Sequence, residues 1–254
     1  MKPTRILTAL LLALAASGGA QAVPLSALVN GGSIIAGDKV FDMWNVSLNM
    51  SSSGSLVDLA QIDVAALNDG GMSPGPGLSF VVSNNALNVT SNDGNYNFLD
   101  LQFGFRVTPT LPGNQINGAS MDNLFAFLTW TGDDTLGDSG SYIQEWIGTT
   151  AGGSDLVNSM HQEFSALGGH NNITAQIIDS SAFLPQASIY VTKDILVWAT
   201  GAAGAVGAGP ALTESAGILS FEQRFAQTSV PEPATLALFG LGLLGLGLAR
   251  ARRT

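Results

Sequence analysis

A serine in a glycine-rich segment is the first feature of this sequence that could do chemistry. Gly137-Asp138-Ser139-Gly140 has the small, polar surroundings in which hydrolases often hold a nucleophile. A serine becomes nucleophilic only when a base lies within reach. The two histidines, His161 and His170, both follow the serine, whereas proteases with this type of loop carry their base before it. We therefore predict that Ser139 is a turn residue and not a catalytic nucleophile.

The histidines are a second candidate, for metal binding. His161-Gln162-Glu163, together with His170, supplies imidazole and carboxylate groups of the kind that coordinate zinc. Their spacing matches no zinc signature, and the H-E-x-x-H pattern is absent. We predict solvated or hydrogen-bonded histidines and no zinc centre.

Aspartates are a third candidate, for calcium. Asp133, Asp134 and Asp138 cluster the carboxylate oxygens that hard cations prefer, and extracellular calcium is abundant enough to fill weak sites. Counted from Asp134, the fifth position is Asp138, but Ser139 stands where an EF-hand loop needs glycine. Aspartates are also ordinary turn residues. We expect no cofactor, and these three residues remain weak calcium candidates.

The charge distribution excludes several classes of partner. The 254 residues include 19 acidic and 9 basic side chains. Residues 23–230 hold 18 acidic side chains against 4 basic ones, which gives this segment a formal charge of −14. Affinity for nucleic acid and for anionic lipid comes from clustered lysine and arginine, so we expect neither as a partner of the body. The absence of cysteine also excludes disulfides and thiolate metal sites.

The first 22 residues form a predicted signal peptide. Lys2 and Arg5 give a basic start, residues 6–16 an apolar run, and Ala20-Gln21-Ala22 a small-x-small cleavage site. An apolar run of this length is too short to span a bilayer permanently. We expect signal peptidase to remove the segment, so that the mature chain begins at Val23.

The end of the sequence contains three parts in a fixed order. Val230-Pro231-Glu232-Pro233 is followed by an uncharged apolar run over 234–249 and then by Arg250, Arg252 and Arg253. As a helix rising ~1.5 Å per residue, the run would span roughly 24 Å, which is short of the ~30 Å hydrocarbon core. The prolines do not fit inside a helix, so they separate this predicted transmembrane segment from the body. Arginines flanking a span stay in the cytoplasm, which places the body outside.

This arrangement resembles the PEP-CTERM sorting signal of Gram-negative bacteria, which combines a Pro-Glu-Pro motif, a short apolar helix and a terminal arginine cluster. The resemblance covers only residues 230–254. It implies that a membrane-embedded exosortase recognises the segment and cuts near Pro231 to Pro233. The body would then be released or transferred to the cell surface or the exopolysaccharide matrix. An ordinary single-pass anchor is the alternative, and it also places the body outside the cytoplasm.

The body, residues 23–229, is rich in alternating apolar and polar residues. In the segment 99–107, the odd-numbered residues from Leu99 to Val107 are apolar and the intervening ones are mostly polar, which predicts a half-buried strand. Other predicted strands cover 44–50, 62–67, 78–82, 87–90, 142–147, 173–178, 189–197 and 218–225. One-sided strands need a second sheet to cover them, so we predict an all-β fold, a single β-sandwich of jelly-roll type.

Three segments carry separate expectations. The run 124–130 is apolar on both faces, which predicts a central strand buried on both sides. Apolar residues recur at helical spacing over 156–167, which predicts either one helix or an irregular crossover. The low-complexity segment 201–209 predicts a long hairpin loop, and residues 227–230 are then the spacer before the anchor. The tryptophans are expected in the core: Trp44, Trp130, Trp146 and Trp198.

Together these features predict an exported, non-enzymatic protein of the cell surface or extracellular matrix, whose body associates with exopolysaccharide. The alternative is a secreted hydrolase acting on matrix polymers through carboxylates that meet only in the fold, because such pairs leave no local motif. Two carboxylates facing each other across a cleft would favour the hydrolase, and scattered acids would favour the binding module.

Overall fold

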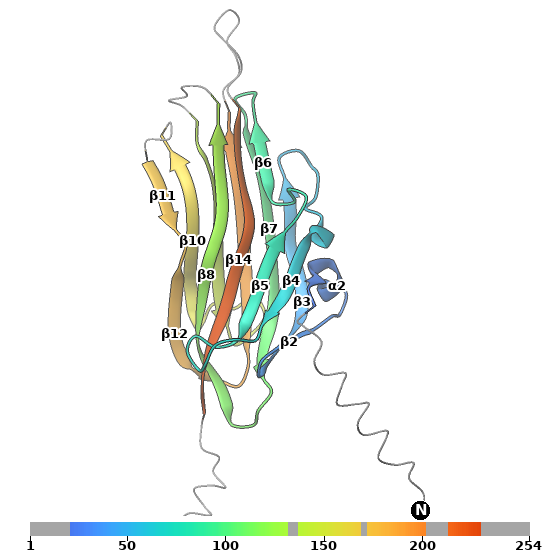
Figure 1. Cartoon of the computed structure of the whole chain (residues 1–254), viewed down its shortest axis with the longest axis vertical. Coiled ribbons are helices and arrows are strands. Elements are labelled where there is room, and N and C mark those ends of the chain that lie inside the picture. Colours follow the sequence, from blue (N-terminus) through green and yellow to red (C-terminus); the bar gives the residue numbers. More distant parts are fainter. Residues whose placement is uncertain (1–20, 132–136, 169–171, 202–212, 230–254) are drawn as a thin grey trace, which may run out of the picture.

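The computed structural model describes residues 21–131, 137–168, 172–201 and 213–229. Within these ranges the chain forms two antiparallel seven-stranded sheets, packed face to face as a sandwich (Figure 1), which confirms the predicted all-β fold. No helix in them is long and apolar enough to cross a membrane. The predicted signal peptide up to Ala20 and the predicted transmembrane segment lie outside them.

The sheet nearer the viewer in Figure 1, here the front sheet, has the strand order β1-β4-β5-β14-β8-β12, with β6 also paired to β14. The back sheet has the order β11-β10-β9-β13-β7-β3-β2. The front strands are β1 (Val23–Pro24), β4 (Ile62–Leu67), β5 (Gly77–Val82), β6 (Asn88–Ser91), β8 (Asn114–Trp130), β12 (Asp179–Gln186) and β14 (Glu214–Ser229). The back strands are β2 (Ile34–Ala36), β3 (Lys39–Ser51), β7 (Tyr96–Pro109), β9 (Ser139–Gly148), β10 (Val157–Leu167), β11 (Asn172–Gln176) and β13 (Ile189–Thr200). Two short helical segments, α2 (Leu25–Val29) and η2 (Leu59–Gln61), lie beside them.

The hydrophobic core lies between the inner faces of the two sheets. The predicted apolar face of β7, from Leu99 to Val107, is buried, and its polar residues point outward. β13 pairs with β7 in continuous register from Ile189↔Val107 to Thr200↔Tyr96, so the same alternation extends along β13. Six phenylalanines fill the space between the sheets, each at most 1% exposed: Phe41, Phe80, Phe103, Phe105, Phe221 and Phe225. Tight aromatic packing of this kind fixes the spacing of the sheets.

Two of the less regular segments differ from their predictions. Residues 157–167 form strand β10 and not a helix, because β9 and β11 pair with it on its two edges. Apolar residues stand at near-helical spacing because the inward position between Met160 and Phe164 is a buried glutamine, Gln162, and because a register shift lies between Val157 and Met160. The predicted hairpin loop at 201–209 lies almost wholly outside the described residues, but the strands before and after it, β13 and β14, belong to different sheets and do not pair as a hairpin.

The end of the body also differs from its prediction. Residues Gln227 to Ser229 are not a spacer but the last part of β14, where they pair with Ile116, Gln115 and Asn114 of β8. β14 runs down the front sheet and ends at the lower end of the molecule in Figure 1. The strand β14 therefore extends to the residue before Val230.

Candidate functional site

An exposed aromatic side chain marks the outer face of the front sheet. Phe125 on β8 is 62% exposed, although the sequence predicts that this strand is buried on both sides. The prediction is wrong because the sandwich has two layers, and within the described chain no third layer covers the outer face of β8. Phe125 and Val81 of β5 both pair with Ser220 of β14, so they lie in one row across the sheet.

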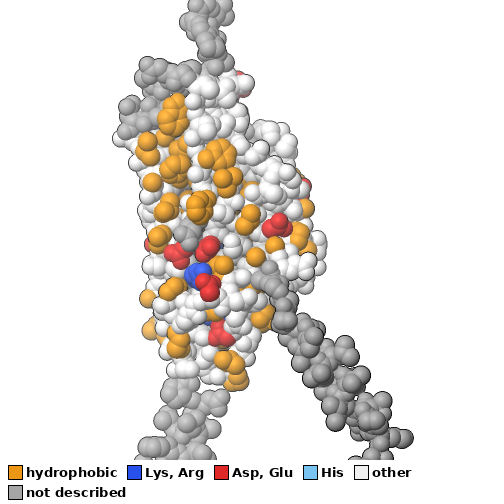
Figure 2. All heavy atoms as spheres, viewed as in Figure 1, with side chains coloured by type: hydrophobic (Ala, Val, Ile, Leu, Met, Phe, Trp, Pro, Cys, Tyr) orange, Lys and Arg blue, Asp and Glu red, His pale blue; other side chains and the backbone are white. Residues whose placement is uncertain are grey.

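Apolar neighbours extend this row into a small patch. Val81 is 49% exposed and Leu219 of β14 is 47% exposed. We call Phe125, Val81 and Leu219 the Phe125 platform. Figure 2 shows hydrophobic side chains gathered over this part of the face, with acidic and basic side chains directly below them. Phe127 is more covered, since its ring lies over Gly217, so Phe125 is the ring that the platform presents to solvent.

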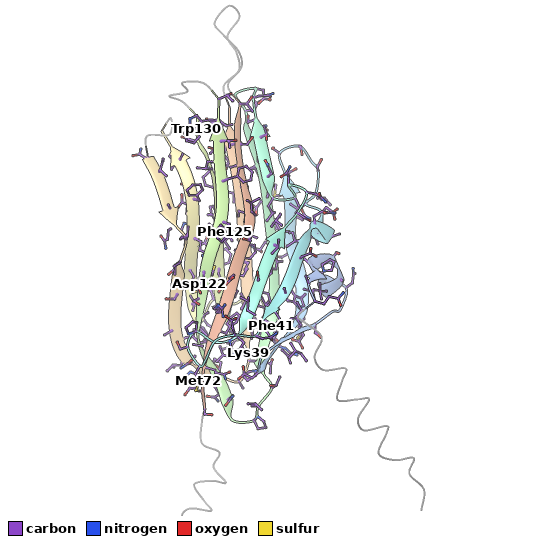
Figure 3. All side chains as sticks on the ribbon, viewed as in Figure 1. Lys39, Phe41, Met72, Asp122, Phe125 and Trp130 are labelled. Atoms are coloured by element: carbon purple, nitrogen blue, oxygen red, sulfur yellow. The ribbon has the colours of Figure 1, made fainter. Side chains whose placement is uncertain are left out.

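A hollow lies on the same face, with Asp122, which is below Phe125 along β8 (Figure 3), in its lining. It has a volume of about 470 Å³ and is lined by β8, β12, β14 and the loop that contains Ser73 and Pro74. Its floor is low because Gly118, Ala182 and Ala226 stand side by side on three paired strands. We call it the Asp122 hollow, after the carboxylate that lines it.

The walls of the Asp122 hollow carry oxygen-bearing side chains. Ser120 and Ser180 face each other across β8 and β12, and Asp122 Oδ2 accepts a hydrogen bond of 3.0 Å from Ser120 Oγ. Figure 3 shows Asp122 below Phe125 along β8, with Trp130 at the upper end of the strand. The face thus places an apolar ring beside hydrogen-bonding groups.

An ion-pair cluster lies on the next strand of the same face. Arg224 of β14 contacts Asp69 at 3.1 Å and Glu222 at 3.6 Å. The guanidinium of Arg224 lowers the pKa of Asp69 below its ordinary value because it donates hydrogen bonds to the Asp69 carboxylate and stabilises its negative charge. Because Asp69 is mostly exposed, the pair adds little stability, and it serves chiefly to neutralise Arg224.

The outer face of the back sheet brings two carboxylates together. Asp194 of β13 and Asp100 of β7 lie close together, and burial together with Asp100 raises the pKa of Asp194 to about 7. Glycosidases hold their two carboxyl groups at least ~5 Å apart, so that the sugar ring fits between them. A pair this close leaves no such room, so Asp100 and Asp194 do not have the arrangement that would favour the hydrolase.

The structure describes only some of the residues singled out as candidates for chemistry. Ser139 is not a turn residue: it begins β9, is fully buried, and its hydroxyl makes no hydrogen bond within the described residues. His161 Nε2 lies 2.9 Å from Glu163 Oε2. Within the described ranges, no three histidine or acidic side chains gather as metal ligands. His170, outside those ranges, cannot be placed with them.

The calcium candidates and the sorting residues are mostly outside the described ranges. Asp138 accepts a 2.6 Å hydrogen bond from the backbone N–H of Gly168, a residue distant in the sequence. Asp133 and Asp134 lie outside the residues that the structure describes. So do Ala20 and residues 230–254, which hold the other predicted sorting residues. Ala22 is described, and it is exposed just ahead of β1.

The tryptophans are only partly in the core, as the structure shows. Trp44 and Trp198 are buried, as predicted, but Trp130 is 42% exposed at the upper end of β8. The prediction fails for Trp130 because it is the last residue of its strand.

The comparison with protein families concerns the end of the chain. Residues 229–253 match the PEP-CTERM protein-sorting motif. The chain ends in a PEP-CTERM sorting signal. This signal begins at Ser229, which is also the last residue of β14, so the sandwich and the PEP-CTERM segment meet without a linker.

Curated proteins give no close relative of the body, and a solved structure resembles it only distantly. No curated protein is significantly similar to the PEP-CTERM chain. Among solved structures, it is similar to TmCBM61 in complex with β-1,4-galactotriose, with 13% identity and a TM-score of 0.23. That similarity covers 74% of this chain and 88% of the other. A likeness this distant carries no argument about the ligand of this chain.

Proposed function

We propose that the protein is exported, trimmed at both ends, and delivered to the cell surface or the extracellular matrix. The PEP-CTERM match at residues 229–253 supports recognition by an exosortase, and the basic and apolar start supports removal of a signal peptide before Val23. A cut near Pro231 to Pro233 would leave β14 complete, because its pairing ends at Ser229. Processing would therefore release the sandwich without unfolding it.

The body, in this proposal, is a non-catalytic module that binds exopolysaccharide through the front sheet. The observation that supports it is the exposed ring of Phe125 beside the Asp122 hollow. A sugar ring has one apolar C–H face, which packs on an aromatic ring, and a rim of hydroxyls, which bind carboxylate and serine oxygens. An open face built from strands also suits a polymer, since the chain can continue beyond the hollow in both directions.

The charge of the body favours an uncharged polysaccharide. Residues 23–230 carry 18 acidic side chains against 4 basic ones. An acidic polymer would be repelled by this charge, and its long-range repulsion would weaken as salt screens it. An uncharged polysaccharide is not repelled by the acidic body, and its hydroxyls can still bind Asp122.

The test is affinity electrophoresis of the exported protein in gels that contain neutral exopolysaccharide from the producing culture. We expect wild type to be retarded and Phe125→Ala to lose affinity by about 10-fold, because aromatic anchors dominate such contacts. Tyr96→Ala is the matched control, since Tyr96 is a half-exposed aromatic residue on the back sheet. It should bind as wild type does.

Two outcomes would overturn the proposal. Equal retardation of wild type and Phe125→Ala would show that the Phe125 platform is not the binding surface. Release of new reducing ends from the polymer by the wild-type protein would show a hydrolase instead of a binding module.

A further inference from the structure

Three polar side chains meet in the hydrophobic core, away from the front face. Lys193 of β13, Glu145 of β9 and Gln223 of β14 are each fully buried. Lys193 Nζ contacts Glu145 Oε2 and lies 2.5 Å from Gln223 Oε1. Gln223 Nε2 donates to Glu145 Oε1 at 3.2 Å, which closes the triangle, and the Phe221 ring lies 5.8 Å from Nζ.

The triangle places an amine against the carbonyl of an amide. Because a C=O bond is ~1.23 Å long, Lys193 Nζ can be no more than about 3.7 Å from the carbonyl carbon Cδ of Gln223. Reacting atoms in near-attack arrangements lie ~3–3.5 Å apart, so Nζ is within reach of Cδ after a small adjustment. All three side chains are fully buried, so water, the nucleophile that would compete with the amine, is kept out.

Burial also sets the protonation of the pair. Removal from water lowers the pKa of Lys193 and raises that of Glu145, although each charge partly offsets the effect on the other. Both shifts favour a neutral amine beside a protonated carboxyl group. A neutral lysine amine in a dry site is a competent nucleophile, and a carboxyl group that touches both nitrogens can move protons between them.

We propose that Lys193 and Gln223 become joined by an intramolecular isopeptide bond, with Glu145 as the acid and base. The lysine ammonium gives a proton to Glu145 Oε2, and the neutral Nζ attacks Cδ of Gln223. Glu145 then protonates Nε2 as the Cδ–Nε2 bond breaks, and Nζ loses its second proton to the carboxylate. Ammonia leaves and takes this last proton from Glu145 to become ammonium, so the lysine amine and the glutamine amide become one amide, the carboxylate is restored, and no external reagent is needed.

The bond would fasten the two sheets to each other inside the core, through the strand that leads to the export signal. β13 lies in the back sheet, while β14 lies in the front sheet and leads directly to the PEP-CTERM segment. A chain without cysteine has no disulfides, and this link would supply the missing covalent bond. Force applied to the carboxyl end of the body would then reach both sheets.

The test is tryptic mapping of the folded, full-length protein after denaturation. Lys193 is the only lysine or arginine between Arg106 and Arg224, so an unlinked chain yields separate fragments 107–193 and 194–224. The proposal predicts one fragment, 107–224, lighter than its sequence by one ammonia. Cleavage after Lys39, the other buried lysine, is the internal control, because Lys39 lies against the carboxylate of Asp38.

Two variants test the roles proposed for Glu145 and Lys193. Glu145→Gln keeps the shape of the side chain but removes the acid, so the folded variant should yield the two separate fragments. Trypsin should also cleave the Lys193→Arg variant after residue 193, because arginine cannot form the bond. Circular dichroism shows whether each variant is folded. Quantitative cleavage after Lys193 in the wild type would overturn the proposal, as would a link from Lys193 to Glu145 with loss of water. Neither result would bear on polysaccharide binding at the front face.

Discussion

Gln223 of β14 donates a hydrogen bond from Nε2 to Oε1 of Glu145 on β9, at 3.2 Å, so polar side chains connect the two sheets through the middle of the core. Both residues are fully buried, and both also contact Lys193. Buried polar groups are costly unless each one has a partner. The stability of the sandwich therefore depends on keeping this cluster complete.

Removing the carboxylate alone should be strongly destabilising. Glu145→Ala leaves the Lys193 amine in the core without its acidic partner, and broken buried ion pairs cost ~3–5 kcal/mol. Urea denaturation measures the difference in free energy of unfolding. The triple variant Lys193→Met, Glu145→Leu and Gln223→Leu leaves none of the three polar groups unpaired in the core and should recover part of the loss. A cost below ~1 kcal/mol for the single variant would contradict a buried pair.

The Asp194 and Asp100 pair predicts a dependence of stability on pH. The pKa of Asp194 is raised to about 7 in the folded protein, while an unfolded aspartate titrates near ~4. The folded state therefore binds the extra proton between these values, and stability falls as pH rises through this window. We expect Asp194→Asn to be about 1–2 kcal/mol more stable than wild type at pH 8, after discounting for solvent screening.

That advantage should disappear at about pH 3, below the pKa of an unfolded aspartate, where the carboxyl group is mostly protonated in both states. Urea denaturation of Asp194→Asn and wild type at the two pH values measures this difference in the free energy of unfolding. A difference of the same size at both pH values would point to packing and not to titration.

Two phenylalanines on the front sheet should separate stability from binding. Phe80 is fully buried and stacks on Phe221 with ring centroids 4.4 Å apart, so Phe80→Ala should cost ~3–5 kcal/mol. Phe125 is mostly exposed, and its replacement by alanine should change stability by less than ~0.5 kcal/mol. Thermal denaturation of the two variants checks this. A large loss for Phe125→Ala would mean that the ring supports the fold.

Strict alternation predicted the strands well, because a half-buried strand has one apolar face. Residues 62–67 coincide with β4, and 99–107 lie within β7. The prediction failed over 156–167, where a buried glutamine among the inward residues, together with a register shift, imitates helical spacing. Local periodicity cannot reveal such a shift, since it depends on how β9 pairs with the strand.

The exposed platform and the buried triangle were harder to predict, although each has a signal in the sequence. Phe125 lies in a run that is apolar on both faces, and a two-layer sandwich buries only one of them. Lys193, Glu145 and Gln223 each interrupt the apolar face of a strand at an inward position. Those positions predict burial, but the meeting of three side chains from two sheets depends on strand order, which the sequence does not contain.

Fractionation of the producing cells with intact-mass analysis tests the central claim, that the sandwich is a processed extracellular module. We expect a chain that starts near Val23 and ends near Val230, recovered with the exopolysaccharide outside the cells. A full-length chain in the cytosol, with the signal peptide and the PEP-CTERM segment both present, would contradict it.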